Sequence, residues 1–164
     1  MTTQEIYERQ RAWFTRPGAV FGHSISSDGS GHCVYIDRRC VYIDPGDEQV
    51  RCAVGCILSP PSLRTILDHF FSGGVEDLID AFPEIVEREN WDKETERFLG
   101  DTQRMHDEHA LNVAPLGQEE RAENEAALGL FIRDLDNYAV EYGLDVDRAK
   151  AFCDVSMDPE EIDQ

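Results

Sequence analysis

The chain has 164 residues, 41% of them hydrophobic, and a formal net charge of -19. This length and composition suit one folded domain with a full core. No apolar run reaches the roughly 18 residues of a membrane span, and the N-terminal stretch MTTQEIYERQRAW lacks the apolar block of a signal peptide, so the sequence predicts a cytoplasmic protein.

The negative charge lies almost entirely in the C-terminal half. Residues 1–73 carry 7 Arg or Lys and 8 Asp or Glu, a net of -1, whereas residues 74–164 carry 8 and 26, a net of -18. Such a surface repels nucleic-acid phosphates and anionic membranes, so neither is an expected direct partner. A basic protein is the complementary partner; the alternative is that the charge only keeps the protein soluble.

The first predicted element is a helix over residues 3–14, where apolar side chains recur near one side. Pro17-Gly18 ends it. The sequence Cys-Val-Tyr-Ile-Asp then occurs twice, at residues 33–37 and 40–44, and β-branched and aromatic residues of this kind favour strands. We therefore predict an α+β class, a mostly helical single domain with a small two-stranded β ribbon over residues 33–44.

The apolar run at residues 50–58 is too short for periodicity to distinguish a strand from a buried helix. Pro60-Pro61 is predicted to stop it. Ser62 is the predicted N-cap of a helix that reaches Phe71, with a regular apolar stripe.

The rest of the chain has the pattern of helices. We predict a short helix from Val75 that Pro83 breaks, and further helices over residues 94–111, 119–142 and 146–153. Gly143 is the expected C-cap of the 119–142 helix. The globular domain is predicted to span residues 1–153, and residues 154–164 to form a loose acidic tail.

Cysteine and histidine spacing indicates one metal-binding hypothesis. Cys52, Cys56, His106 and His109 could supply two thiolates and two imidazoles to a tetrahedral zinc ion. His106 and His109 are three residues apart and would share a helix face. The alternative is that the cysteines are small apolar core residues, in which case no cofactor is expected.

A second hypothesis is nucleophilic catalysis by Cys52, with His106 as general base and Asp107 as the orienting group. A helix N-terminus beside Cys52 would lower the pKa of its thiol. Adjacent helix residues point about 100° apart, so Asp107 is not expected to hold the His106 ring without a kink. A small hydrolase or transferase would fit this arrangement.

Three stretches resemble a family of small phage and prophage proteins. They are residues 40–46 (CVYIDPG) with 51–58 (RCAVGCIL), residues 102–107 (TQRMHD) and residues 142–144 (YGL). The resemblance implies a phage-encoded accessory protein in a bacterial cytoplasm, with no biochemical activity attached. It also implies a cluster of Cys40, Cys52 and His106. The resemblance leaves open whether this cluster binds metal, reacts or only packs.

These observations favour an acidic accessory protein that binds a host or phage protein. The most specific form of this hypothesis is an inhibitor that mimics the charge of a nucleic acid. The Cys52/His106 enzyme and a structural zinc module remain the alternatives.

Overall fold

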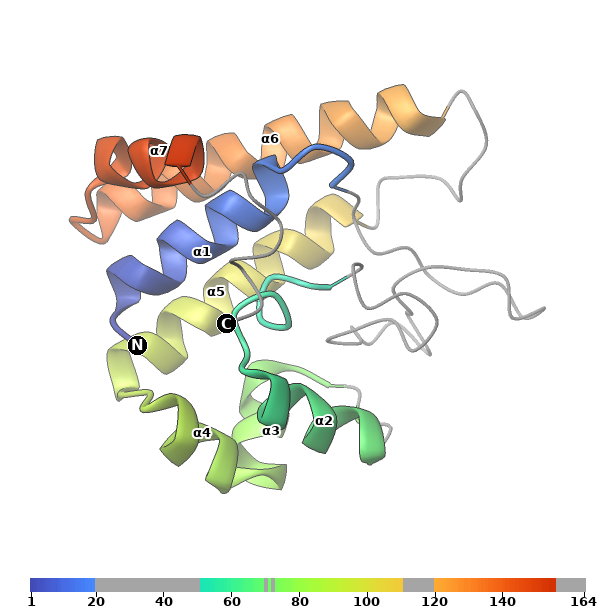
Figure 1. The fold of residues 1–164 in the computed structure, drawn as a ribbon, viewed down its shortest axis with the longest axis vertical. Helices are drawn as coiled ribbons and strands as arrows, with labels where there is room; N and C mark the ends of the chain where they lie inside the picture. The colour runs from blue at the N-terminus through green and yellow to red at the C-terminus, as the bar shows by residue number, and fades with distance from the viewer. Residues whose placement is uncertain (20–50, 70, 72, 111–119, 156–164) are drawn as a thin grey trace.

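The computed structural model describes residues 1–19, 51–69, 71, 73–110 and 120–155. Within these ranges the chain forms seven α-helices and no strand (Figure 1). The helices are α1 (Thr3–Thr15), α2 (Pro60–Asp68), α3 (Val75–Ala81), α4 (Pro83–Glu89), α5 (Lys93–Ala110), α6 (Glu120–Glu141) and α7 (Val146–Val155). The predicted α+β class is therefore wrong for the described part, which is all-α; the expected ribbon at 33–44 lies outside it.

Helix α1 confirms the helix predicted over residues 3–14 and shows why it starts where it does. The Thr2 hydroxyl accepts a hydrogen bond from the Glu5 backbone N–H (3.3 Å), and the Glu5 carboxylate accepts one from the Thr2 N–H (2.7 Å). This reciprocal capping box satisfies two backbone donors that a helix N-terminus otherwise leaves unpaired.

The α-helices form two groups (Figure 1). Helix α1 packs against α5, α6 and α7, and α5 runs alongside α6. Side chains of α1 and α6 meet in the core, where the rings of Phe14 and Phe131 lie edge to face with centroids 5.0 Å apart. The second group, α2 to α4, is reached through residues 51–58 and joins the first by packing of α3 on α5.

Residues 51–58 form a buried turn. This segment is therefore neither of the two alternatives that the sequence left open, a strand or a buried helix. The Cys56 N–H donates to the Cys52 carbonyl oxygen (3.0 Å), closing a single helical turn. Side chains from the helices satisfy the backbone that this turn leaves unpaired: Gln10 donates to the Ala53 carbonyl (2.9 Å), and the Val54 N–H donates to Gln103 (3.2 Å). A buried segment without regular structure needs such partners.

Pro60-Pro61 and Pro83 end the preceding elements, as predicted, and they also begin the next helices. Pro60 and Pro61 occupy the first two positions of α2, with Ser59 rather than Ser62 as N-cap. Pro83 likewise starts α4, a helix that the sequence pattern did not predict. The first helical positions need no N–H donor, and the fixed φ of proline suits them.

The C-terminal helices agree with the predictions for residues 94–111, 119–142 and 146–153. Gly143 follows α6 with φ of +71°, a left-handed conformation that explains the glycine. None of the helices in the described ranges is both long and apolar enough to cross a membrane.

Candidate functional site

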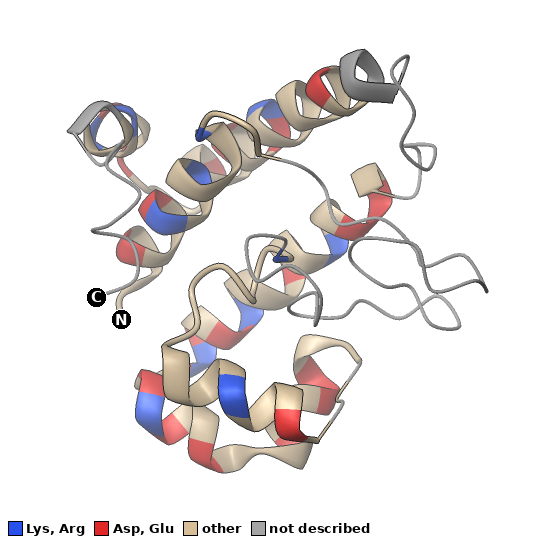
Figure 2. Cartoon of the chain, turned by 45° about the vertical axis from the view of Figure 1, so that its right-hand side comes forward, with Lys and Arg blue, Asp and Glu red and all other residues tan. Residues whose placement is uncertain are grey.

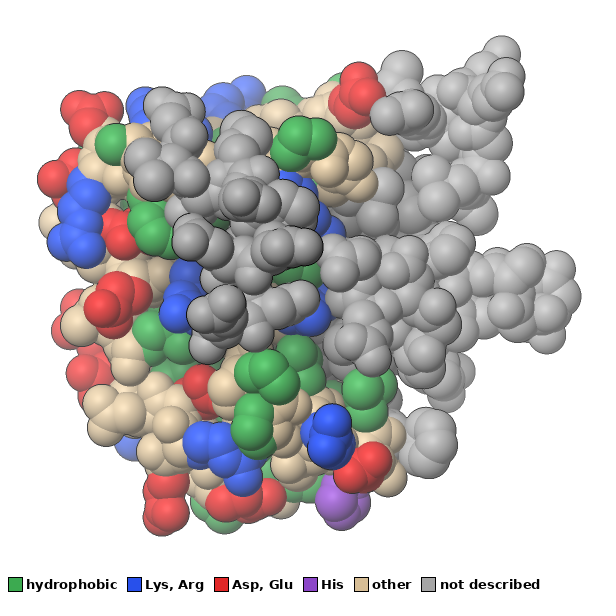
Figure 3. Space-filling model, in the orientation of Figure 1, with side chains coloured by type: hydrophobic (Ala, Val, Ile, Leu, Met, Phe, Trp, Pro, Cys, Tyr) green, Lys and Arg blue, Asp and Glu red, His purple; other side chains and the backbone are tan. Residues whose placement is uncertain are grey.

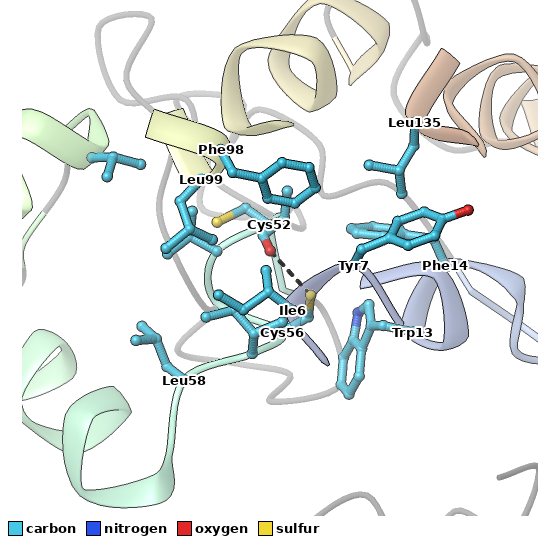
Figure 4. Packing of buried hydrophobic residues seen from close by; sticks show 14 of the residues in the cluster. Ile6, Tyr7, Trp13, Phe14, Cys52, Cys56, Leu58, Phe98, Leu99 and Leu135 are labelled. Carbon is cyan, nitrogen blue, oxygen red and sulfur yellow. Dashed lines mark hydrogen bonds between the residues drawn. The ribbon is translucent and has the colours of Figure 1, made fainter. Parts of the chain in front are cut away.

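Cys52 and Cys56 lie inside the core, and both are free thiols (Figure 4). Cys52 is 0% exposed, and its Sγ accepts a hydrogen bond from the Gly55 N–H at 3.3 Å. The Cys56 thiol donates to the Ala53 carbonyl oxygen at 3.2 Å. Burial raises the pKa of Cys56, and the nearby Cys52 raises it further, so Cys56 stays protonated at neutral pH.

These surroundings are those of packed thiols rather than exposed nucleophiles. Both thiols are out of reach of reagents in solvent, and for Cys56 burial also opposes formation of the thiolate, which is the reactive form. We therefore expect thiol reagents to label Cys52 and Cys56 more slowly in the native protein than after unfolding in urea, measured by mass spectrometry of quenched samples. Faster labelling of Cys52 than of a model thiol would instead favour the Cys52/His106 enzyme.

His106 is 1% exposed and lies between two aromatic rings of neighbouring helices. Its ring centroid is 5.4 Å from that of Phe14 and 5.9 Å from that of Phe131. His106 Nδ1 is 3.1 Å from Asp107 Oδ1, so the expectation that Asp107 could not reach this ring is wrong. Rotation about the side-chain bonds of two adjacent residues brings these ends together although their Cα–Cβ bonds diverge.

The Asp107 carboxylate has a second partner that the sequence reasoning missed. Gln103 donates to Asp107 Oδ1 at 2.6 Å through its amide nitrogen, while its amide oxygen accepts from Val54. Gln103 thereby connects the 51–58 turn to Asp107. Its spacing of four residues from Asp107 on one helix was the only signal in the sequence.

The structure does not assemble the predicted zinc set of Cys52, Cys56, His106 and His109. No three His, Cys, Asp or Glu side chains in the described ranges could together hold a metal ion. His109 instead pairs with Asp134 of α6, with Nε2 and Oδ2 3.0 Å apart. Cys40 lies outside the described residues, so the cluster of Cys40, Cys52 and His106 stays a prediction.

Gln10 is the other buried polar residue that the turn depends on. It is 0% exposed, and its amide nitrogen donates both to Ala53 and to the Thr102 hydroxyl, at 2.9 and 3.0 Å. Its Oε1 has no hydrogen-bond partner among the described residues. These contacts crosslink α1, the 51–58 turn and α5, which is a structural arrangement.

The surface offers a different candidate, which we call the acidic surface. It consists of the exposed carboxylates between residues 75 and 94: Glu76, Asp77, Asp80, Glu84, Glu87, Asp92 and Glu94. The only basic residues in this range are Arg88 and Lys93. Acidic residues recur along the lower group of helices in Figure 2, and acidic side chains stand beside basic ones along the lower edge of the face in Figure 3.

Most of these carboxylates face solvent without a cationic partner. Lys93 pairs with Glu96, and Arg88 donates to the Ser62 hydroxyl at 3.1 Å. Among the described residues, Glu76, Asp80, Glu84 and Glu87 form no ion pair or side-chain hydrogen bond. The acidic surface therefore keeps its charge available for a partner.

Two of its members lie where a helix disfavours negative charge. Asp80 is in the last turn of α3, which has no basic residue there, and Glu87 is in the last turn of α4. The C-terminus of a helix carries partial negative charge, so a carboxylate at this end costs stability.

No family model, curated protein or solved structure matches this chain.

Proposed function

We propose that the protein is a phage-encoded accessory factor of the bacterial cytoplasm that acts by binding a basic host or phage protein through the acidic surface. An inhibitor that competes with nucleic acid for that basic protein is the sharpest form of the proposal. The acidic surface would then take the place of phosphates.

One observation supports this proposal above the others: exposed carboxylates without partners, some of them at helix C-termini. A charge that served only solubility could stand anywhere on the surface. Asp80 and Glu87 instead oppose the dipoles of the helices that carry them. Residues that cost stability without a structural benefit are typical of functional surfaces.

Burial argues against the enzyme alternative. Cys52 and His106 are 0% and 1% exposed, so a substrate could reach them only after the core opened. The acidic surface, by contrast, is accessible in the folded state.

The test is a capture experiment with the tagged full chain in bacterial lysate. We expect a stoichiometric basic partner at physiological salt that is lost at high salt, because screening shortens the reach of exposed charges. Asp80→Asn combined with Glu87→Gln should weaken capture. The matched control, Glu141→Gln combined with Asp147→Asn, makes the same charge change on α6 and α7 and should leave capture unchanged.

Two results would contradict the proposal. The first is a complex whose yield does not change between low and physiological salt. The second is equal loss of capture in the two double variants, which would mean that net charge matters and the acidic surface does not.

A further inference from the structure

Helix α6 has an exposed side that is apolar rather than acidic. Its inner side, which packs toward α1 and α5, carries Leu128, Phe131 and Leu135, all at most 7% exposed. Leu130 and Val140 are instead 44% and 65% exposed, and they are two of the three large apolar side chains exposed in the described ranges. The helix runs along the upper edge of the molecule in Figure 1. Two such side chains on one outer helix indicate a contact surface.

The exposed residues of α6 fall on one strip. With about 100° of rotation per residue, Leu130 and Val140 each lie roughly 40° from the direction opposite the buried Leu135. Arg133 and Asn137 fall between these two directions, and both are exposed. We call the four residues Leu130, Arg133, Asn137 and Val140 the outer strip. It has an apolar residue at each end and two polar residues in the middle.

The outer strip contains no carboxylate, although residues 74–164 have a net charge of -18. Arg133 donates from Nε and Nη2 to Oδ1 of its neighbour Asp134, both at 3.0 Å, so the charged pair beside the centre of the strip is neutral. Two copies of a chain with a net charge of -19 repel one another. A second copy meets the least repulsion where the contact surface itself carries no unpaired carboxylate.

The pattern of the outer strip is symmetric about residue 135. Leu130 and Val140 each lie five positions from it, and Arg133 and Asn137 each lie two positions from it. When a helix packs antiparallel against its own copy, a twofold axis pairs residues at equal distances on opposite sides of the centre. Leu130 then faces Val140 of the second copy, and Arg133 faces Asn137 of the second copy. Apolar side chains therefore meet at both ends and polar side chains meet in the middle.

The central charges of two such copies also complement one another. At 1.5 Å per residue, Arg133 and Asp134 lie within about 3 Å of the twofold axis, measured along the helix. The antiparallel arrangement brings the two ion pairs together with opposite directions. Each guanidinium thereby approaches the Asp134 carboxylate of the second copy as well as its own, and arginine can bond to both.

Gly129 allows a second helix to approach closely. It lies inside α6, where a glycine lowers helix stability. No steric constraint among the described residues requires it, because a Cβ at this position would meet no atom within 4 Å. Its neighbour Leu130 is the first residue of the outer strip, so the missing side chain leaves room for the second helix where the strip begins.

We propose that the protein forms an antiparallel dimer in which the outer strips of two copies pack against each other. The contact buries few large side chains, so the dimer is weak, with a dissociation constant of roughly 100 μM. Helices α3 and α4 belong to the other helix group and take no part in it. The dimer therefore displays two acidic surfaces, and its formation does not depend on the proposed function.

Sedimentation equilibrium of the full chain at physiological salt measures this dimer. Val140→Ser should weaken it about tenfold or more, because the twofold axis removes the apolar contact twice. The change should leave the fold intact, since Val140 is mostly exposed. Phe152→Ser is the matched control: it removes the third exposed large apolar side chain, on α7, and should leave the dissociation constant unchanged.

Substitutions of Asn137 test the charge at the centre. Asn137→Asp should tighten the dimer about threefold, because a carboxylate then faces Arg133 of the second copy at two symmetric positions. Asn137→Lys should weaken it by at least as much. General repulsion between two acidic chains predicts the opposite order, since the first change adds negative charge and the second removes it.

The pairing of residues is measured by isotope-filtered NOE spectroscopy on an equal mixture of ¹³C-labelled and unlabelled chain. We expect cross-peaks between the methyl groups of Leu130 and those of Val140. Ten positions separate these residues on one helix, which corresponds to about 15 Å. This distance is too long for an NOE within one chain, so the cross-peaks report only the dimer.

Four results would each overturn the inference. They are a chain that stays monomeric up to about 1 mM, equal weakening by Val140→Ser and Phe152→Ser, the reverse order of the two Asn137 variants, and a dimer without the methyl cross-peaks. Salt-sensitive capture by a chain that stays monomeric would overturn the dimer and leave the proposed function standing. A dimer with these properties and no captured partner would overturn the proposed function alone.

Discussion

Carboxylates behave differently in the two helix groups. Between α1, α6 and α7 they are paired: Asp136 accepts from the Tyr7 hydroxyl at 2.6 Å and from Arg11 at 3.0 Å, and the buried Glu8 pairs with Arg148 at 2.8 Å. On α3 and α4 they stand in solvent. Carboxylates thus hold helices together in the first group and supply unneutralised charge in the second. The net charge of the sequence adds these two roles together and does not distinguish them.

Glu89 is the exception within the acidic region, and it gives the largest expected effect. Its Oε1 accepts hydrogen bonds from the Ser59 N–H and hydroxyl (3.0 and 2.5 Å) and from the Ser62 hydroxyl (2.6 Å). It therefore caps α2 from the end of α4. Glu89→Ala should cost about 3 kcal/mol of unfolding free energy in urea, because it leaves the buried Ser62 hydroxyl and the partly buried Ser59 donors without this acceptor.

The neighbouring Glu87→Ala is the matched control, since Glu87 is exposed and unpaired. It should change the free energy of unfolding by less than about 0.5 kcal/mol. Equal effects at the two positions would contradict the distinction between paired and unpaired carboxylates.

Asp136→Ala should have the next largest effect. The change removes the acceptor of both Tyr7 and Arg11, whose side chains are mostly buried. We expect a loss of about 2 kcal/mol in urea unfolding. A double-mutant cycle with Tyr7→Phe should give a clearly non-additive result, and simple additivity would mean that the two residues do not interact.

Alkaline pH should weaken the same region. Burial raises the pKa of Tyr7, and its hydrogen bond to Asp136 raises it further. The unfolded chain therefore loses the phenolic proton at lower pH than the folded protein does. Stability from this group is complete below pH about 10 and falls as pH rises above it.

Urea unfolding at several pH values above 9 would measure this fall, which should be shallower in Tyr7→Phe. Tyr138 also has a raised pKa, through burial and its bond to Asp101, so the variant should retain part of the fall. Identical pH profiles for the variant and the parent chain would contradict the assignment to Tyr7.

The sequence predicted the long amphipathic helices well, because burial of one face imposes a periodicity that α1, α5 and α6 retain. It missed α4, because Pro83 ends the preceding element as predicted and also starts the next helix, and the proline alone does not distinguish these two roles. The positions of Cys52 and Cys56 depend on contacts with Gln10 and Gln103, which are distant in sequence, so spacing could not separate packed thiols from ligands.

The smallest expected effect is the most informative for function. Asp80→Asn with Glu87→Gln removes two carboxylates from helix C-terminal turns, where the dipole disfavours them. Thermal and urea unfolding should show stability unchanged or raised by a few tenths of a kcal/mol. Stabilisation together with weaker capture would show that these carboxylates serve binding at the expense of the fold. A loss above about 1 kcal/mol would mean that these carboxylates stabilise the fold and are not placed for binding.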